Sequence, residues 1–366
     1  MRIGINALYL IPGGVGGTEI YLRSLLEALA QLDSANQYLI WTNQETAQAV
    51  LPVAPNFEVL PQQVSARNRP ARILWEQTVL PFSAARHKLS VLFNPGFTAP
   101  LVCACPQVTV FHDLQHKRHP EYFRWFDLPF WRALLFGAAH RSKVLIAVSE
   151  ATRADLHRFY RLPKERVRVV PHGVDSAFFS LTASEAAAPF LLAVSTLHPH
   201  KNLDGLLRAF AIFAGAHPEY RLVIAGLKGF HTKPLENLRD QLGLQDRVIF
   251  TGWIPREELY RLFAQARAFV YPSRFEGFGM PILEALAAGL PTACANVEPM
   301  AGITGGAALL FDPDDIPALA KHLETLACDE NVRNRLHAAG PKRAEQFTWA
   351  AAARATLAAL TEAAGQ

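Results

Sequence analysis

Hydrophobic residues in the first half of the chain form short runs that alternate with longer stretches of helical spacing. The short runs predict strands, and apolar residues three or four positions apart predict amphipathic helices. Gly, Pro and Ser separate most strands from the helix that follows. The predicted strands are Ile3–Leu10, Tyr38–Thr42, Val108–Phe111, Val144–Val148 and Val167–Val170, and Val91–Phe93 is a further short apolar run. The predicted helices are Thr18–Ala30 and Glu150–Tyr160.

The alternation lapses between Ser176 and Pro189, where small and polar residues predict a linker. It then resumes in the same order. The predicted strands are Phe190–Val194, Tyr220–Ala225, Val248–Thr251, Ala268–Tyr271, Pro291–Ala295 and Ala308–Phe311. The predicted helices are Asn202–Ala216, Lys233–Leu242, Glu257–Ala266, Pro281–Ala288, Ile316–Ala327, Glu330–Ala339 and Thr348–Ala363.

This repeated strand–turn–helix order is typical of an α/β fold in which helices wrap a parallel sheet. The 366 residues have the length of about two domains. We therefore expect two facing, doubly wound, Rossmann-like domains. Ligands of such sheets bind beyond the carboxyl ends of the strands, which predicts a site in the cleft between the domains.

The composition excludes several classes of protein. With 50% hydrophobic and 19% charged residues, the chain is globular rather than disordered or fibrous. No uncharged apolar run approaches the roughly 18–20 residues of a membrane span. The N-terminus lacks the basic region of a signal peptide and predicts a first strand. Four cysteines without zinc or disulfide spacing favour a reducing, cytoplasmic location.

The net charge of +4 is unevenly distributed. Residues 1–180 contain 19 Lys and Arg against 13 Asp and Glu, a net charge of +6, so residues 181–366 have a net charge of −2. A basic first half suggests an anionic partner, such as a phosphate-bearing acceptor or an acidic membrane surface. Nucleic acid is not expected, because no basic stripe is interleaved with aromatic residues in a known binding motif.

A glycine-rich loop, Gly13 to Gly17, joins the first predicted strand to the first helix. Four glycines in five residues let the backbone approach a ligand closely, beside the free N–H groups of the helix. The spacing is not G-x-G-x-x-G, so a dinucleotide motif is only weakly supported. Gly16 and Gly17 therefore either approach a ligand or form a tight turn that binds nothing.

Lys201 lies just before a predicted helix, in the loop Ser195–Asn202. A cation there is unfavourable for the helix dipole unless an anion lies between them. Lys201 is therefore a candidate phosphate ligand, with a solvated surface lysine as the alternative.

The segment SRFEGFGMPILE, Ser273 to Glu284, places a glycine-rich turn before a helix that begins with Pro281. A bare helix N-terminus attracts phosphate. Two carboxylates eight positions apart, Glu276 and Glu284, can accept hydrogen bonds from ribose or sugar hydroxyls. Glu284 lies among apolar residues, so we expect it to be partly buried; pairing with a structural Arg is the alternative.

His112 and Asp113 follow a predicted strand. A histidine at the carboxyl end of such a strand can bond a sugar hydroxyl or place a proton, and Asp113 could position it. The alternative is a core histidine.

Together these motifs resemble the retaining GT-B-fold glycosyltransferases of group 1, family 4, over nearly the whole chain. Glu276 and Glu284 match the family's E-x7-E signature, within SRFEGFGMPILEALAAGLPT. The resemblance implies an acceptor-side domain at 1–178, onto which a final helix at about 348–366 packs back, and a nucleotide-sugar-binding domain at 188–345.

The resemblance also implies roles for individual residues. Lys201 and backbone amides of the glycine-rich turn would hold the diphosphate, Glu284 the ribose and Glu276 the donor sugar. His112, Glu276 and Lys201 are the expected catalytic residues. The expected donor-binding residues are Gly16, Gly17, Thr196, Lys201, Gly226, Lys228, Trp253, Ile254, Glu276, Gly277, Phe278, Gly279, Met280, Pro281 and Glu284.

One position departs from the family pattern. Many members have an Arg some five residues before the Lys, where this chain has Thr196. Lys228 or Arg274 would have to supply the missing cation. The S-T-L-x-P-x-K-N sequence resembles a subgroup with mannosyl- and rhamnosyltransferases of surface-polysaccharide assembly.

The expected reaction is a metal-independent hexosyl transfer without a cofactor. The sugar–phosphate bond loosens to an oxocarbenium-like state, and the acceptor hydroxyl attacks from the same face with the leaving phosphate as base. The donor is a nucleotide-sugar, with GDP-mannose as first guess. The acceptor is a glycan or a polyprenyl-linked glycan. A nucleotide-sugar epimerase and a non-catalytic sugar-nucleotide-binding module are the alternatives.

The segment His116–Lys143 combines basic and aromatic residues. It either rests on a membrane surface, as a peripheral contact beside a lipid-linked acceptor, or forms a core helix pair with a charged outer face.

Overall fold

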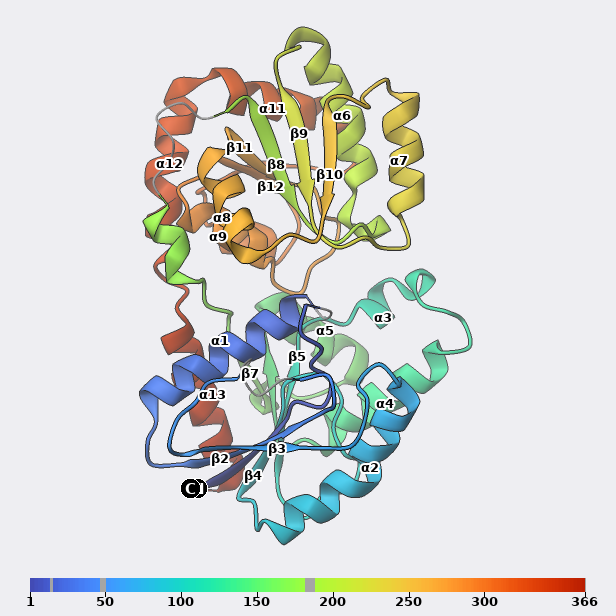
Figure 1. Ribbon diagram of the computed structural model, residues 1–366, viewed down its shortest axis with the longest axis vertical. Coiled ribbons are helices and arrows are strands. Elements are labelled where there is room, and N and C mark those ends of the chain that lie inside the picture. The colour runs from blue at the N-terminus through green and yellow to red at the C-terminus, as the bar shows by residue number, and fades with distance from the viewer. Residues whose placement is uncertain (14–15, 47–50, 182–187, 366) are drawn as a thin grey trace. The chain divides into compact units, whose positions relative to one another are not determined.

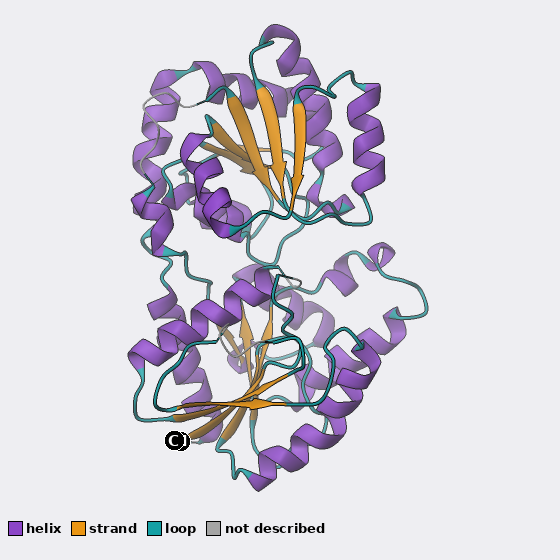
Figure 2. Ribbon diagram, in the orientation of Figure 1, coloured by secondary structure: helices purple, strands orange, loops and turns teal. Residues whose placement is uncertain are grey.

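The computed structural model describes residues 1–13, 16–46, 51–181 and 188–365 (Figure 1). The chain forms two compact units, Met1–Gly173 with Thr348–Gln366 (unit 1) and Val174–Phe347 (unit 2). Each unit has one parallel sheet with helices on both faces (Figure 2). The predicted α/β class with two parallel sheets is therefore confirmed.

The sheet of unit 1 has seven strands in the order β3-β2-β1-β4-β5-β6-β7. Their bounds are β1 Arg2–Asn6, β2 Gln37–Thr42, β3 Phe57–Pro61, β4 Val91–Asn94, β5 Gln107–Phe111, β6 Val144–Ala147 and β7 Val167–Val169. The helices are α1 Gly17–Leu32, α2 Arg69–Arg86, α3 Gln115–Arg118, α4 Leu128–Arg141, α5 Glu150–Tyr160 and α13 Trp349–Ala364. Every residue of β4, β5 and β6 is buried, as expected for strands covered on both faces.

The last helix, α13, belongs to unit 1 and packs against α1. Thr348 caps its N-terminus by accepting a hydrogen bond from the Ala351 amide, 3.1 Å away. The backbone of Trp349 approaches Gly173 so closely that a Cβ there would lie 2.2 Å from the Trp349 nitrogen. This contact requires glycine at the end of the first part of unit 1.

Unit 2 has a six-stranded sheet in the order β10-β9-β8-β11-β12-β13. The strands are β8 Phe190–Val194, β9 Arg221–Ala225, β10 Val248–Gly252, β11 Ala268–Tyr271, β12 Thr292–Ala295 and β13 Leu309–Phe311. The helices are α6 Leu203–Ala216, α7 Thr232–Gln241, α8 Arg256–Gln265, α9 Met280–Ala287, α10 Met300–Thr304, α11 Ile316–Cys328 and α12 Glu330–Ala344.

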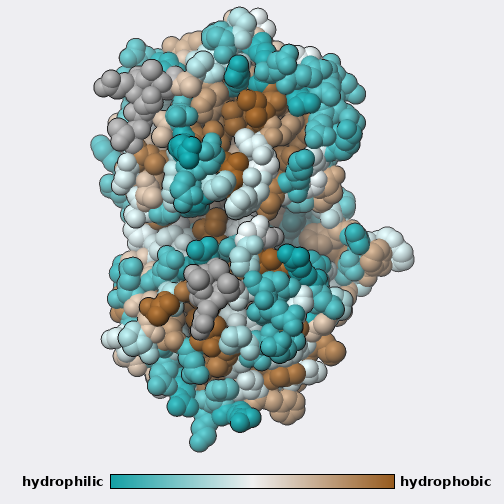
Figure 3. Space-filling model, in the orientation of Figure 1, coloured by the Kyte–Doolittle hydropathy of each residue, from teal (hydrophilic) through white to brown (hydrophobic). Residues whose placement is uncertain are grey.

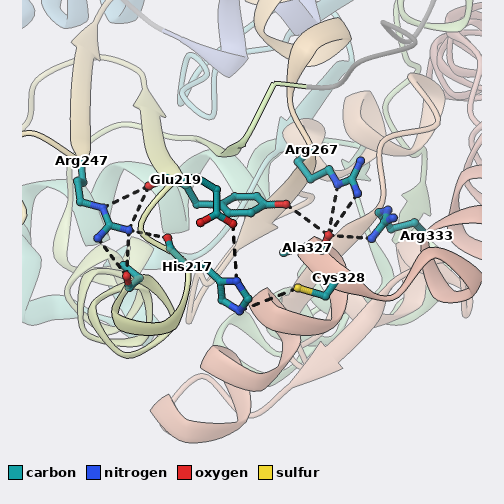
Figure 4. Close-up of polar contacts among 9 residues, drawn as sticks. His217, Glu219, Arg247, Arg267, Ala327, Cys328 and Arg333 are labelled. Atoms are coloured by element: carbon teal, nitrogen blue, oxygen red, sulfur yellow. Dashed lines mark hydrogen bonds and ion pairs between the residues drawn. The ribbon is translucent and has the colours of Figure 1, made fainter.

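Arginine side chains donate hydrogen bonds to carbonyls at two helix carboxyl ends, near the amino ends of these strands (Figure 4). The Ala327 carbonyl, at the end of α11, accepts hydrogen bonds from Arg333 at 2.9 Å and Arg267 at 3.3 Å. Arg247 donates to the His217 carbonyl, just past α6, at 2.7 Å. Cations at helix carboxyl ends complement the dipole and satisfy orphan carbonyls, so this end of unit 2 serves the fold.

Two sequence expectations need correction. The first strand ends at Asn6 and not at Leu10, because Asn43 Nδ2 donates to the Leu8 and Leu10 carbonyls in place of a neighbouring strand. No element was expected over residues 57–86, where β3 and the 18-residue helix α2 lie. The linker residues 182–187 lie outside the described part of the chain.

Candidate functional site

Lys201 and Glu276 form a largely buried ion pair at the carboxyl end of the unit 2 sheet. Lys201 ends the short helix η5 (Pro199–Lys201) after β8, and Glu276 lies in the loop between β11 and α9. Lys201 Nζ is 2.6 Å from Glu276 Oε1, and the two side chains are 14% and 12% exposed. The structure thus brings together two residues that are 75 positions apart in sequence.

Tyr271, the last residue of β11, completes this cluster. Its hydroxyl donates to Glu276 Oε1 at 2.7 Å and lies 3.5 Å from Lys201 Nζ. Burial raises the pKa of Glu276, but the charge of Lys201 and hydrogen bonds from Lys201 and Tyr271 outweigh it and hold the pKa below its ordinary value. Glu276 is therefore an ionised acceptor at neutral pH.

Glu284, on α9, lies in a second network of charges. Its Oε1 is 3.3 Å from Arg256, and Arg256 also contacts Asp175 at 3.1 Å. Tyr260 donates to the same carboxylate of Asp175 at 2.5 Å. Burial raises the pKa of Glu284 to about 7, although the charge of Arg256 opposes this shift. Pairing with an Arg, left open by the sequence, is thus present in the structure.

The charges of both networks act on Tyr271. Burial, then the charge and hydrogen bond of Glu276, and then the charge of Glu284 raise the pKa of the Tyr271 hydroxyl well above its ordinary value. The hydroxyl stays protonated at neutral pH. It therefore acts as a fixed donor to Glu276.

The glycine-rich turn before α9 has the backbone that a close approach requires. Gly279 has φ +108°, a conformation that favours glycine, and no side chain caps the helix that follows. Pro281 occupies the first turn, where its missing N–H costs nothing. Gly277, Phe278 and Met280 complete the turn, of which Phe278 is buried. The uncapped N-terminus suits an anion.

The other expected donor residues of unit 2 lie in loops that follow strands. A Cβ at Gly226 would lie 2.2 Å from the Ser195 carbonyl oxygen, so the loop after β9 packs tightly on the loop after β8 that contains Thr196. Trp253 is 60% exposed and Ile254 is half-buried, both just past β10. These positions are at the correct end of the sheet for a ligand.

The structure separates the two candidates for the missing cation. Arg274 contacts Asp314 at 2.5 Å and also bonds the Asn202 side chain. Lys228 is exposed and makes no ion pair within the described residues. Of these two residues, Lys228 is therefore the one whose charge is free to meet an anion.

His112, at the end of β5 in unit 1, is buried and neutral. Its Nε2 donates to the Pro95 carbonyl at 2.9 Å, because a carbonyl can only accept, and this leaves Nδ1 as the acceptor nitrogen. Burial lowers the pKa of His112 to about 4. The rings of Tyr21, Phe97 and His172 lie with centroids 4.8, 5.0 and 5.6 Å from its own.

Gly16 and Gly17 lie at the start of α1. Gly16 has φ +60°, which requires glycine, and a Cβ there would meet nothing within 4 Å. Open space and a left-handed backbone leave room for a close approach by a ligand. Gly14 and Val15, also in this predicted loop, lie outside the described residues.

Sequence reasoning missed Tyr271, Arg256 and His172. The sequence could have indicated Tyr271, because this tyrosine is the last residue of a correctly predicted strand and has a polar hydroxyl. Arg256 and His172 had none, because their partners are far away in sequence. Among the described residues no group of His, Cys, Asp and Glu could hold a metal ion, and no helix is long and apolar enough to cross a membrane.

Comparisons with known proteins agree with this geometry. The model for glycosyl transferases group 1 matches residues 179–343, and the model for glycosyltransferase family 4 matches residues 15–178. The chain therefore belongs to the group 1 glycosyltransferases of family 4. Both sheets are those of its GT-B fold.

This family 4 member has relatives that are mannosyltransferases. It is 30% identical over 253 residues to the O-antigen chain mannosyltransferase B of Escherichia coli, covering 66% of each chain. It is 26% identical over 279 residues to the serotype-specific mannosyltransferase WbdA of Escherichia coli, covering 71% of this chain and 33% of the relative. The chain thus spans only about a third of the length of WbdA.

A solved structure shows the same fold. HepE from Anabaena, in complex with UDP and glucose, is 20% identical to this chain, with a TM-score of 0.77 and 99% of each chain covered.

Proposed function

We propose that the protein transfers a hexose, mannose in the first instance, from a nucleotide-sugar to a hydroxyl of a glycan or lipid-linked glycan, with retention of configuration. The observation that carries this proposal is the buried Lys201–Glu276–Tyr271 cluster beside the uncapped α9 N-terminus. It combines a cation and helix amides for a diphosphate with an ionised carboxylate for sugar hydroxyls.

In this proposal Lys201, Lys228 and the α9 turn stabilise the charge that develops on the leaving diphosphate. Fixed positive groups in a site largely screened from water stabilise such charge strongly. Glu276 holds the donor sugar, and Lys201 and Tyr271 hold Glu276 in place. Glu284 accepts a ribose hydroxyl, with Arg256 fixing its carboxylate.

His112 supplies a neutral acceptor nitrogen for a sugar hydroxyl. Because its pKa is about 4, it remains uncharged at neutral pH and cannot protonate the leaving group. The leaving phosphate is then the base for the acceptor hydroxyl. The mannosyltransferases among the relatives support mannose as the transferred sugar, and the UDP complex of HepE supports a nucleotide donor.

The first test is donor turnover by Lys201→Ala and Glu276→Ala. We expect each to lower kcat by about 10²–10³. Lys233→Ala, in an exposed ion pair of the same unit, is the control. Chelation of metal with EDTA should leave the wild-type rate unchanged. If both variants kept the wild-type rate, the site assignment would be wrong.

We also propose that the segment His116–Lys143, from α3 through α4, rests on an anionic membrane surface. Trp125, Phe126 and Phe130 are 83%, 56% and 54% exposed, next to exposed Arg124. Hydrophobic residues are visible on this projecting segment at the right of Figure 3. Exposed aromatic rings beside cations suit an interface with acidic lipid. Leu134, Leu135, Ala138 and Ala139 of α4 are buried, so the same segment also contributes to the core.

A further inference from the structure

Unit 1 contains a cavity of about 660 Å³ that none of the donor residues lines. It lies beyond the carboxyl ends of β4 and β5, and residues of α2, α3 and α4 form its walls. Four aromatic side chains line it: Phe97, Tyr122, Phe123 and Trp131. Aromatic walls of this kind suit the apolar face of a sugar ring.

Three arginines also line the cavity: Arg69, Arg72 and Arg124. The two carboxylates among the lining residues belong to Asp113 and Asp127. Asp113 accepts a hydrogen bond from the Gln115 amide at 2.8 Å, so part of its capacity is used within its own turn. The Arg69 guanidinium lies over the Trp131 ring, 5.0 Å from the centroid.

Arg72 is the decisive residue of this cavity. It is 8% exposed, and its Nε is buried without a hydrogen-bond partner in the described part of the chain. Burial lowers its pKa, although the charge of Glu76, one helical turn away, opposes this. Glu76 itself accepts hydrogen bonds from Asn6 and Thr98. A buried guanidinium charge is costly unless an anion balances it, and no ion pair of Arg72 lies within the described residues.

Phe97 links the cavity to the expected reaction centre. Its φ is +70°, a strained value for a side chain of this size, and its ring packs against His112 at 5.0 Å. Strain of this kind is often retained at functional positions. The Phe97 ring therefore lines the cavity and also packs against His112, the residue that the proposed function assigns to the sugar.

We propose that this cavity binds a phosphate group of the sugar acceptor, held by Arg72, Arg69 and Arg124. The assignment to the acceptor rests on the proposed transfer reaction. Guanidinium groups match phosphate oxygens in geometry and charge. The acceptor is accordingly a sugar phosphate or a lipid-linked sugar diphosphate, and a neutral glycan lacks the group that the arginines bind.

The experiment compares binding of mannose 1-phosphate with that of mannose, by calorimetry, while a nucleoside diphosphate saturates the donor site. We expect the phosphate to tighten binding about tenfold or more. Arg72→Gln and Arg124→Gln should remove that preference. Arg86→Gln, an exposed position at the end of the same helix α2, should keep it. Arg124 is exposed, so its variant reports even if the Arg72 variant does not fold.

A second arm uses a short polyprenyl diphosphate-linked sugar in detergent. Arginine-dependent binding in this arm alone identifies a lipid-linked source, and binding in both arms identifies the shared phosphate. Equal affinity for mannose and its phosphate, with no arginine-dependent binding of the lipid, would overturn the proposal. Nucleoside diphosphate binding is measured separately, and its absence would count against the proposed transfer and not against the cavity.

Discussion

Removing the ammonium of Lys201 should destabilise unit 2 by leaving Glu276 charged and buried. The two side chains are 14% and 12% exposed, with 2.6 Å between Nζ and Oε1. Breaking a buried pair by removing one partner costs about 3–5 kcal/mol. Tyr271 still donates to Glu276 at 2.7 Å in Lys201→Met, which places the expected loss near the lower end, about 3 kcal/mol.

The double variant separates this penalty from lost packing. Lys201→Met with Glu276→Gln removes both charges, so we expect it to be about 2 kcal/mol more stable than Lys201→Met alone. Lys233→Met breaks an exposed pair, in which Lys233 is 80% exposed, and should change stability by no more than about 0.5 kcal/mol.

The loss should also depend on pH. The lowered pKa of Glu276 stabilises the fold above the ordinary value of 4.5, and this contribution disappears as the pH falls through the folded-state pKa. The difference between wild type and Lys201→Met should therefore shrink on acidification.

Equilibrium unfolding in urea measures these differences. With two units in the chain, the relevant transition is the one that a nucleoside diphosphate shifts. The reasoning is refuted if the double variant is no more stable than Lys201→Met, or if the loss in Lys201→Met is the same at pH 4 and pH 7.

Three further variants test other features. Burial raises the pKa of Glu284 to about 7, so between pH 4.5 and about 7 the folded chain keeps a proton that the unfolded chain releases. Stability should therefore fall as the pH rises through this range, by about 1.4 kcal/mol per pH unit, and Glu284→Gln should remove that slope in urea titrations. Gly226→Ala should lower the melting temperature, since its Cβ meets the Ser195 carbonyl at 2.2 Å, whereas Gly215→Ala, with open space in α6, should raise it or leave it unchanged. Trp125→Ala with Phe126→Ala should reduce sedimentation with anionic vesicles at low salt, and Ile212→Ala, an exposed residue of α6, should not; wild type that never sediments contradicts the membrane contact.

Local patterns in the sequence account for most of the fold. The apolar runs that became β5, β6 and β11 are buried strands, and their hydrophobicity is what a doubly covered sheet requires. The elements β3 and α2 were not predicted, because β3 ends in Pro61 and is half-exposed, and because α2 contains Pro81. Both features weaken the periodic signal on which the prediction depends.

The site was accessible from sequence only where its signal was local. The glycines before α9 and the two glutamates of the motif lie within twelve residues. The ion pair of Lys201 with Glu276, the contact of Arg256 with Glu284 and the buried Arg72 depend on side chains brought together by folding. Their pKa shifts follow from burial, which composition and spacing do not show.

The anomeric configuration of the product tests the central claim most directly. GDP-mannose and an acceptor are incubated with the protein, and the new linkage is assigned by nuclear magnetic resonance. We expect an α-linked mannose with release of GDP, lost in Lys201→Ala and kept in Lys233→Ala. A β-linked product, conversion of the donor sugar without an acceptor, or undiminished transfer by Lys201→Ala would contradict a retaining transferase centred on Lys201 and Glu276.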